Sequence, residues 1–136
     1  MRPESSWQPL ALSLLRFVAG LCFLQHGLAK LLGFPHVASY PAHLPPLLLI
    51  AGIIESVGGA LVLLGLLTRP AALIMSGEMA IGYFMEHFPR SAFPILNGGE
   101  AALLFCFIFL YLAAAGGGPI SLDRLIASRR TTLARV

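Results

Sequence analysis

Charged residues are scarce in this sequence of 136 residues. Asp, Glu, Lys and Arg together make up 11% of the chain, whereas about 25% is usual in a soluble domain. Apolar residues reach 57%, so a soluble fold of this size would lack the charge to cover its surface. This composition excludes an ordinary soluble domain and indicates that the lipid bilayer is the solvent. We therefore expect a single membrane domain over residues 1–136.

Paired cysteines and cofactor motifs are also missing. Cys22 and Cys106 each lie inside an apolar run, and no C-x-x-C occurs, which argues against a disulfide framework and a dithiol redox motif. The four histidines do not have the spacing of metal ligands, so we expect no metal site. No G-x-S-x-G, P-loop or dinucleotide motif is present. The sequence therefore assigns no catalytic residue.

The apolar residues that dominate the chain form four stretches of roughly hydrocarbon length. They predict an all-α fold, an integral membrane bundle of four transmembrane helices over about 9–32, 46–67, 70–87 and 95–115. Prolines and glycines separate these stretches. A short amphipathic helix is predicted over about 121–130, lying on the membrane surface with its arginines near anionic headgroups. The alternative for this segment is a solvated basic tail.

The net charge of +3 is read as a topology signal. The basic residues lie at helix ends and in the tail, so we expect no nucleic-acid partner. Arg69 and the tail arginines predict a cytoplasmic side, and four spans then place both termini in the cytoplasm. Arg90, in a loop expected to face outward, departs from this pattern. The expected location is a bacterial plasma (inner) membrane, with the lipid bilayer as the main partner.

Three charged residues are predicted near the middle of the bilayer. At a rise of ~1.5 Å per residue, Arg16, Glu55 and Glu78 each lie about halfway along their helices. A charge at the bilayer centre costs at least about 2.5–3.5 kcal/mol, so these side chains are expected to face inward and form a buried polar network. Arg16 would then pair with Glu55, with Glu78, or with both.

A second polar layer is predicted nearer the outer side. His26 and Lys30 in the first helix would meet Asn97 and Glu100 in the fourth. Together the two layers suggest a proton relay or a site for a polar headgroup such as a quinone carbonyl. The alternative is a polar clasp that only holds the helices together.

Five short motifs in this order resemble the DoxX family. They are Arg16…His26-Gly27-x-x-Lys30, Gly52-x-x-Glu55-x-x-Gly58-Gly59, Leu63-Leu64-Gly65-Leu66-x-Thr68-Arg69, Asn97-Gly98-Gly99-Glu100 and Gly118-x-x-Ser121-Leu122-Asp123. The resemblance covers roughly residues 10–126. Recurrent polar positions of the family match Arg16, His26, Lys30, Glu55, Arg69 and Glu100. Glu78 is less clearly part of the pattern, so its role rests on the physical argument.

The resemblance implies a four-helix membrane protein. DoxX relatives are linked to thiosulfate oxidation coupled to quinone and to thiol or oxidative-stress complexes, and the broader group includes assembly factors. The first hypothesis is therefore a membrane subunit of an oxidoreductase system that exchanges electrons with the quinone pool: the bundle would bind quinone, and a soluble redox partner protein would carry the redox centre, with no cofactor assigned to this chain. The second is a non-enzymatic scaffold or assembly factor. The third is a proton-coupled small-solute transporter, which would need a homo-oligomer because four helices are few.

Overall fold

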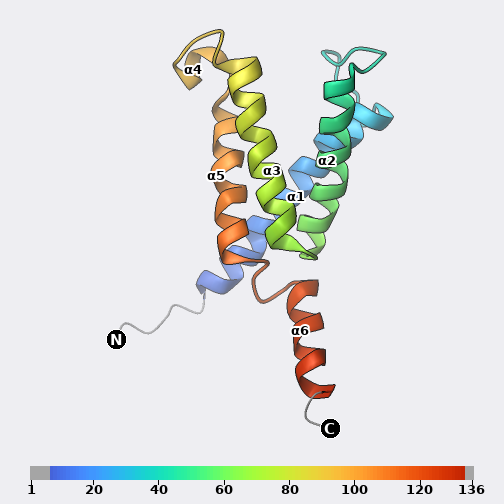
Figure 1. Ribbon diagram of the computed structural model, residues 1–136, viewed down its shortest axis with the longest axis vertical. Coiled ribbons are helices and arrows are strands. Elements are labelled where there is room, and N and C mark those ends of the chain that lie inside the picture. The colour runs from blue at the N-terminus through green and yellow to red at the C-terminus, as the bar shows by residue number, and fades with distance from the viewer. Residues whose placement is uncertain (1–6, 134–136) are drawn as a thin grey trace.

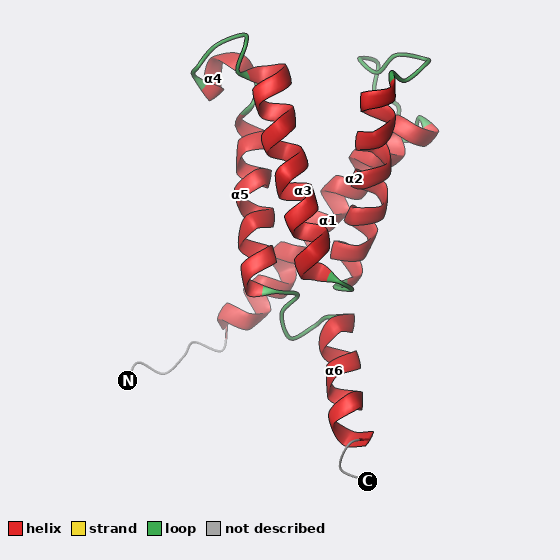
Figure 2. Ribbon diagram, in the orientation of Figure 1, coloured by secondary structure: helices red, strands yellow, loops and turns green. Residues whose placement is uncertain are grey.

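All the regular structure in the described part of the chain is helical. The computed structural model describes residues 7–133 (Figure 1, Figure 2). Its helices are α1 (Trp7–Leu32), α2 (Pro46–Leu64), α3 (Thr68–Gly82), a π-helical turn (Tyr83–His87), α4 (Pro94–Asn97), α5 (Glu100–Ala115) and α6 (Leu122–Leu133). The predicted all-α class is confirmed.

The first two helices of the bundle are longer than the other two that pack in it, α3 and α5. α1 has 26 residues and α2 has 19, and both are long and apolar enough to cross a bilayer core of about 30 Å. α3 has 15 residues and runs directly into the five-residue π-helical turn. α5 is apolar but has 16 residues. Among residues 7–133, two helices thus qualify as spans by length and composition, and the count of four stays a prediction.

The helices pack as two pairs. α1 packs along α2, and α3 packs along α5. Figure 1 shows the pairs close together where α2 turns into α3 and spread apart toward α4. We call the first region the closed end and the second the open end. A core of buried side chains joins the pairs: Phe23, Val62, Met75, Phe109 and Leu112.

Glycines set the spacing within the first pair. A Cβ on Gly20 would collide with the backbone of Leu63, and a Cβ on Gly59 would lie 2.5 Å from the backbone nitrogen of Leu24. The two helix backbones therefore touch, as small residues allow in membrane helices. This contact fixes the antiparallel register, which decides the depth at which charged residues of α1 meet those of α2.

Outward faces of the bundle are apolar. Large hydrophobic residues are exposed on all four long helices, among them Leu14, Phe17, Val57, Leu73, Ile74, Leu104 and Phe107. Exposed apolar area of this extent is unusual on a soluble protein and typical of a surface in contact with lipid or a partner. The faces support the bilayer as the solvent of this chain.

Two helix boundaries differ from the predicted ones because of glycine. α2 ends at Leu64, where Gly65 takes a left-handed conformation (φ 70°) and donates its N–H to the last carbonyls. The fourth apolar stretch is split, because Gly98 (φ 69°) ends α4 before α5 begins at Glu100.

α6 extends away from the bundle along its long axis (Figure 1). Its first residues, Leu122 and Asp123, are partly buried, and the residues from Arg124 to Thr131 are exposed. Only the start of the helix therefore contacts the bundle. Its expected place on the membrane surface stays a prediction.

Candidate functional site: a cavity between the helix pairs

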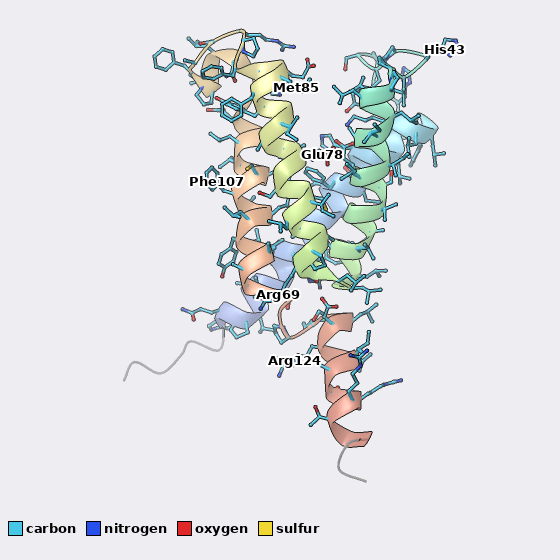
Figure 3. The ribbon with its side chains drawn as sticks, viewed as in Figure 1. His43, Arg69, Glu78, Met85, Phe107 and Arg124 are labelled. Carbon is cyan, nitrogen blue, oxygen red and sulfur yellow. The ribbon has the colours of Figure 1, made fainter. Side chains whose placement is uncertain are left out.

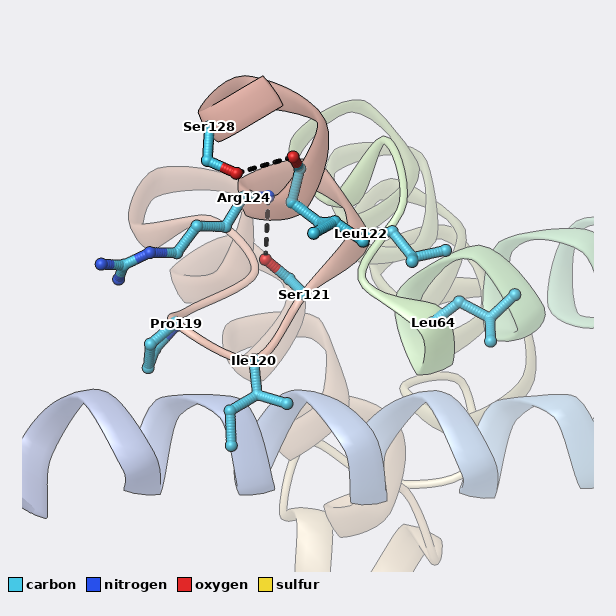
Figure 4. A pocket seen from close by; sticks show the side chains of 8 residues that line it. Leu64, Pro119, Ile120, Ser121, Leu122, Arg124 and Ser128 are labelled. Atoms are coloured by element: carbon cyan, nitrogen blue, oxygen red, sulfur yellow. Dashed lines mark hydrogen bonds between the residues drawn. The ribbon is translucent and has the colours of Figure 1, made fainter. Parts of the chain in front are cut away.

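A cavity of about 460 Å³ lies between the two helix pairs, toward the open end. Phe23, Leu48, Met79, Ile81, Met85 and Phe105 contribute to its apolar walls, and His26, Lys30, Tyr40, Glu55, Glu78 and His87 to its polar lining. Small-molecule sites have this volume and this mixture of apolar walls and few polar groups. A hollow of similar volume where α6 leaves the bundle (Figure 4) is shallower and is lined by Ile120, Leu122 and Arg124.

Lys30 and Glu55 form a buried ion pair on one wall of this cavity. The Lys30 Nζ atom lies 2.6 Å from Glu55 Oε1 and 2.5 Å from Oε2. The side chains are 8% and 4% exposed. Lys30 also lies 5.3 Å from the centre of the Tyr40 ring, a distance at which a cation is attracted to the ring face. The charge of Glu55 is thus compensated within the α1–α2 pair.

Glu78 lies across the cavity, on the side of α3 that faces α1 and α2 (Figure 3). One turn earlier, the fully buried Met75 packs against Gly58 and holds α3 to α2. Glu78 is therefore next to the point where the helix pairs separate. Both of its carboxyl oxygens are buried, and neither has a hydrogen-bond partner among the described residues. Such a group is costly to bury unless a ligand or a proton satisfies it.

Arg16 does not take part in this site, which corrects the expected pairing with Glu55 or Glu78. It is 3% exposed and lies at the closed end. Its Nε donates to the carbonyl of Gly117 at 2.8 Å and its Nη2 to the carbonyl of Ile120 at 2.7 Å.

The remaining Arg16 nitrogen, Nη1, donates to the carbonyls of Val62 and Leu63. These carbonyls belong to the last turn of α2, where backbone acceptors lack partners within the helix. The negative end of the helix dipole also favours a cation there. The backbone of α2 therefore takes the place of the glutamates as the partner of Arg16.

Comparison with known proteins places the chain in a family. Residues 11–87 match DoxX. An uncharacterized protein of Haemophilus influenzae is 46% identical over 128 residues, covering 90% of this chain and 96% of that protein. The chain belongs to the DoxX family. Inner membrane protein YphA of Escherichia coli is 32% identical over 127 residues, covering 86% of this chain and 91% of YphA. No solved structure matches the chain significantly.

Four residues of this DoxX protein were expected to form an outer polar layer, and the structure brings two of them together at the cavity. His26 and Lys30 both line it. The Nδ1 atom of His26 lies 2.8 Å from the carbonyl of Cys22. Glu100 is exposed and lines a separate hollow, because α5 turns it away from the cavity. Glu100 is thus not a neighbour of Lys30.

Asn97, the fourth of these residues, is buried in a network of its own beside the cavity. Its amide nitrogen donates to the carbonyl of Ser91 at 2.8 Å and to the Tyr83 hydroxyl at 3.3 Å. Its side-chain oxygen accepts the N–H of Gly99 at 2.7 Å. The ring nitrogen of His87 lies 3.0 Å from the Asn97 carbonyl. This network fixes the short α4 against the π-helical turn, an element that is frequent at functional sites.

Asp123 is a polar residue of the closed end to which the sequence assigned no role. Its carboxylate accepts the backbone N–H of Leu67 at 2.8 Å and that of Thr68 at 2.9 Å, at the start of α3. Partial burial pushes the pKa of this carboxyl upward, but these hydrogen bonds and nearby Arg16 outweigh burial and hold the pKa below its ordinary value. In the sequence Asp123 is only the last residue of the motif Gly118-x-x-Ser121-Leu122-Asp123, which does not indicate that it meets the start of α3.

Arg69 has the complementary role at the end of α5. Its Nη1 donates to the carbonyl of Ala114 and, at 3.3 Å, to that of Ala113. The negative end of the helix dipole favours a cation at the C-terminus of α5, as it does for Arg16 at the end of α2. The closed end of this DoxX protein thus uses Arg16, Arg69 and Asp123 to bind backbone groups.

Proposed function

We propose that this DoxX protein is the membrane subunit of a quinone-linked oxidoreductase system, and that the cavity between the helix pairs binds the quinone ring. The observation that carries this proposal is the buried carboxyl of Glu78, which has no hydrogen-bond partner among the described residues and lines a cavity with apolar walls. A quinone ring offers the matching chemistry, because it is flat and apolar and carries polar oxygens at two opposite positions.

Two further observations support this ligand. The volume of about 460 Å³ lies in the usual range of small-molecule sites, about 300–1,000 Å³. Phe23 and Phe105, whose ring centres lie 5.0 Å apart, both line the cavity and offer aromatic contacts to a ring. The described chain has no paired cysteines, so a soluble partner protein supplies the redox centre, as in the redox complexes of relatives that the family resemblance suggests.

We also propose a membrane setting, which rests on the positions of the arginines and on the family resemblance. α1, α2, α3 with its π-helical turn, and α5 form the four spans of a bacterial inner membrane, the membrane for which the relative YphA is named. Arg69, Arg124, Arg129 and Arg130 lie at the closed end or on α6, so this side faces the cytoplasm. Both termini are then cytoplasmic, and the cavity opens toward the outer side.

A binding measurement with a short-chain quinone tests the function. Ala51 lines the cavity, and Ala51→Trp should fill part of it and weaken binding to the protein in nanodiscs by at least about 10-fold. Ala114→Trp is the matched control, because Ala114 is exposed and away from the cavity, and it should bind as the unmodified protein does. If the unmodified protein and its native complex bind no quinone, the proposal is wrong.

An assembly role is the second candidate, and α6 favours it. Leu125 is 48% and Ile126 40% exposed on this helix, beside the exposed Arg129 and Arg130. Such a surface can hold a soluble partner at the membrane. Removal of residues 124–136 should then abolish recovery of a partner in mild detergent while quinone binding stays unchanged.

A further inference from the structure

We infer that Glu78 binds the ligand as a neutral carboxylic acid and donates its hydrogen bond to a carbonyl oxygen of the ring. This inference rests on the proposed function, because it assumes that a ring of the quinone class enters the cavity. It adds a specificity-determining residue and a direction of hydrogen bonding. Neither follows from the proposed function alone.

The first step is that no cation among the described residues is hydrogen-bonded to Glu78. Lys30 lines the cavity, and both Glu55 oxygens lie within hydrogen-bond distance of its ammonium. The ring of Tyr40 covers the same ammonium. Because this ammonium is already hydrogen-bonded to Glu55, a charged Glu78 would be a second carboxylate beside one ammonium and would leave a net negative charge in a buried site.

The second step concerns the other titratable groups that α1, the π-helical turn and α5 bring to the cavity. α1 contributes His26, whose Nδ1 atom is directed at the carbonyl of Cys22. The π-helical turn contributes Glu86, 4.0 Å from Arg90, and His87, which contacts the Asn97 carbonyl. α5 lines the cavity with Ala101, Ala102 and Phe105, which do not titrate. None of these side chains hydrogen-bonds to Glu78.

The third step is the chemistry of a carboxyl in such a place. An ionised carboxylate without a partner is strongly disfavoured in a medium of low polarity, and the group takes up a proton instead. The neutral acid has one O–H donor. A quinone carbonyl accepts this hydrogen bond, whereas a ring whose two oxygens are both methylated is a much poorer acceptor and is bulkier.

The fourth step distinguishes donor from acceptor by substitution. Glu78→Gln keeps an N–H donor at the same place but cannot ionise. Glu78→Leu removes the donor and keeps a similar volume. Glu100→Gln is the matched control, because Glu100 is exposed and lies outside the cavity. Removing a buried polar group that has no partner should leave the unliganded fold as stable as before or more stable, so thermal unfolding of each variant checks that it folds.

The experiment is titration of the protein in nanodiscs with a short-chain quinone and with its dimethoxy counterpart, between pH 6 and pH 9. We expect quinone affinity to fall as pH rises, because ionised Glu78 loses its donor. Glu78→Gln should bind about as tightly as the unmodified protein at pH 6 and lose this pH dependence. Glu78→Leu should bind about 10-fold more weakly, the loss of one buried hydrogen bond.

Three results would overturn the inference. They are equal loss of affinity in Glu78→Gln and Glu78→Leu, tighter quinone binding at pH 9 than at pH 6, and equal affinity for the quinone and its dimethoxy counterpart. Each can occur while the unmodified protein still binds quinone, so the proposed function would survive them. Absence of quinone binding at every pH would instead remove the proposed function itself.

Discussion

The two ends of this bundle use charged side chains in different ways. At the closed end, Arg16, Arg69 and Asp123 hydrogen-bond to backbone groups at the ends of α2, α5 and α3. At the open end, the ion pair of Lys30 and Glu55 faces a cavity, and Glu78 in the same cavity has no partner among the described residues. Charges that are fully bonded to the backbone stabilise a fold. A buried carboxyl without a hydrogen-bond partner is costly unless a ligand or a proton satisfies it.

Substitution of Arg16 should have the largest effect on stability, because it removes the contacts that join segments at the closed end. Arg16→Met removes a guanidinium that donates to four carbonyls, and we expect it to lower the free energy of unfolding by about 4 kcal/mol. Thermal unfolding in detergent measures this. Arg124→Met is the control, because Arg124 is exposed and should change stability by less than about 0.5 kcal/mol. Equal effects of the two substitutions would contradict the role of Arg16.

Substitution of Lys30 tests whether the ion pair with Glu55 stabilises the open end. Lys30→Met leaves the carboxylate of Glu55 buried without a cation and should cost about 3 kcal/mol. The double variant Lys30→Met with Glu55→Met removes both charges and should recover most of this loss. A double variant as unstable as the sum of its single changes would show that the two residues act independently.

Gly20 tests the packing that connects the two ends. Gly20→Ala forces α1 away from the backbone of Leu63 and should destabilise the protein by about 2 kcal/mol. Gly77→Ala is the matched control, because no atom lies within 4 Å of a Cβ placed there. Alanine is the better helix former, so this change should be neutral or stabilising by up to about 1 kcal/mol. Similar losses for both glycines would contradict the close approach of α1 and α2.

Asp123 gives the smallest effect and a pH dependence confined to the closed end. Its pKa is lowered from 3.8 in the folded protein, so its stabilisation is fully present above that value and is lost as pH falls through the lower folded pKa. Asp123→Asn keeps one acceptor oxygen in place of two and should cost about 1 kcal/mol at pH 7, as the loss of one hydrogen bond does. The difference from the unmodified protein should shrink as the pH falls below 3.8 and through the lower folded pKa. A difference that grows as the pH falls through this range would contradict this.

The sequence predicted the helices better than the contacts between their charged residues. Apolar length and the intervening prolines predicted the all-α class, and Glu55 and Glu78 do line one cavity. Counting residues from each helix start also placed Arg16 at the same depth in the bilayer as Glu55 and Glu78. This depth was wrong, and the contacts predicted for Arg16 were wrong with it. In an antiparallel pair, residues nearer the start of α1 lie beside residues nearer the end of α2. The glycine contacts of Gly20 with Leu63 set this register, so Lys30 meets Glu55 and Arg16 meets the end of α2.

The contacts of Asp123 with the start of α3 join residues 55 and 56 positions apart. Periodicity within one segment carries no information on such contacts. Glu100 was misplaced for a local reason, because the left-handed Gly98 ends α4, so Asn97 and Glu100 are not one turn apart on a continuous helix.

The divergence of the helix pairs has a consequence for how a molecule would arrive. The helix pairs are joined at the closed end and part toward α4 (Figure 1), and residues of both α2 and α3 line the cavity between them. An apolar compound is far more concentrated among acyl chains than in water. Such a compound would enter between α2 and α3 without passing through water. Hydrated ions that approach from the other side of the membrane would meet the closed end, where arginines are already hydrogen-bonded to carbonyls.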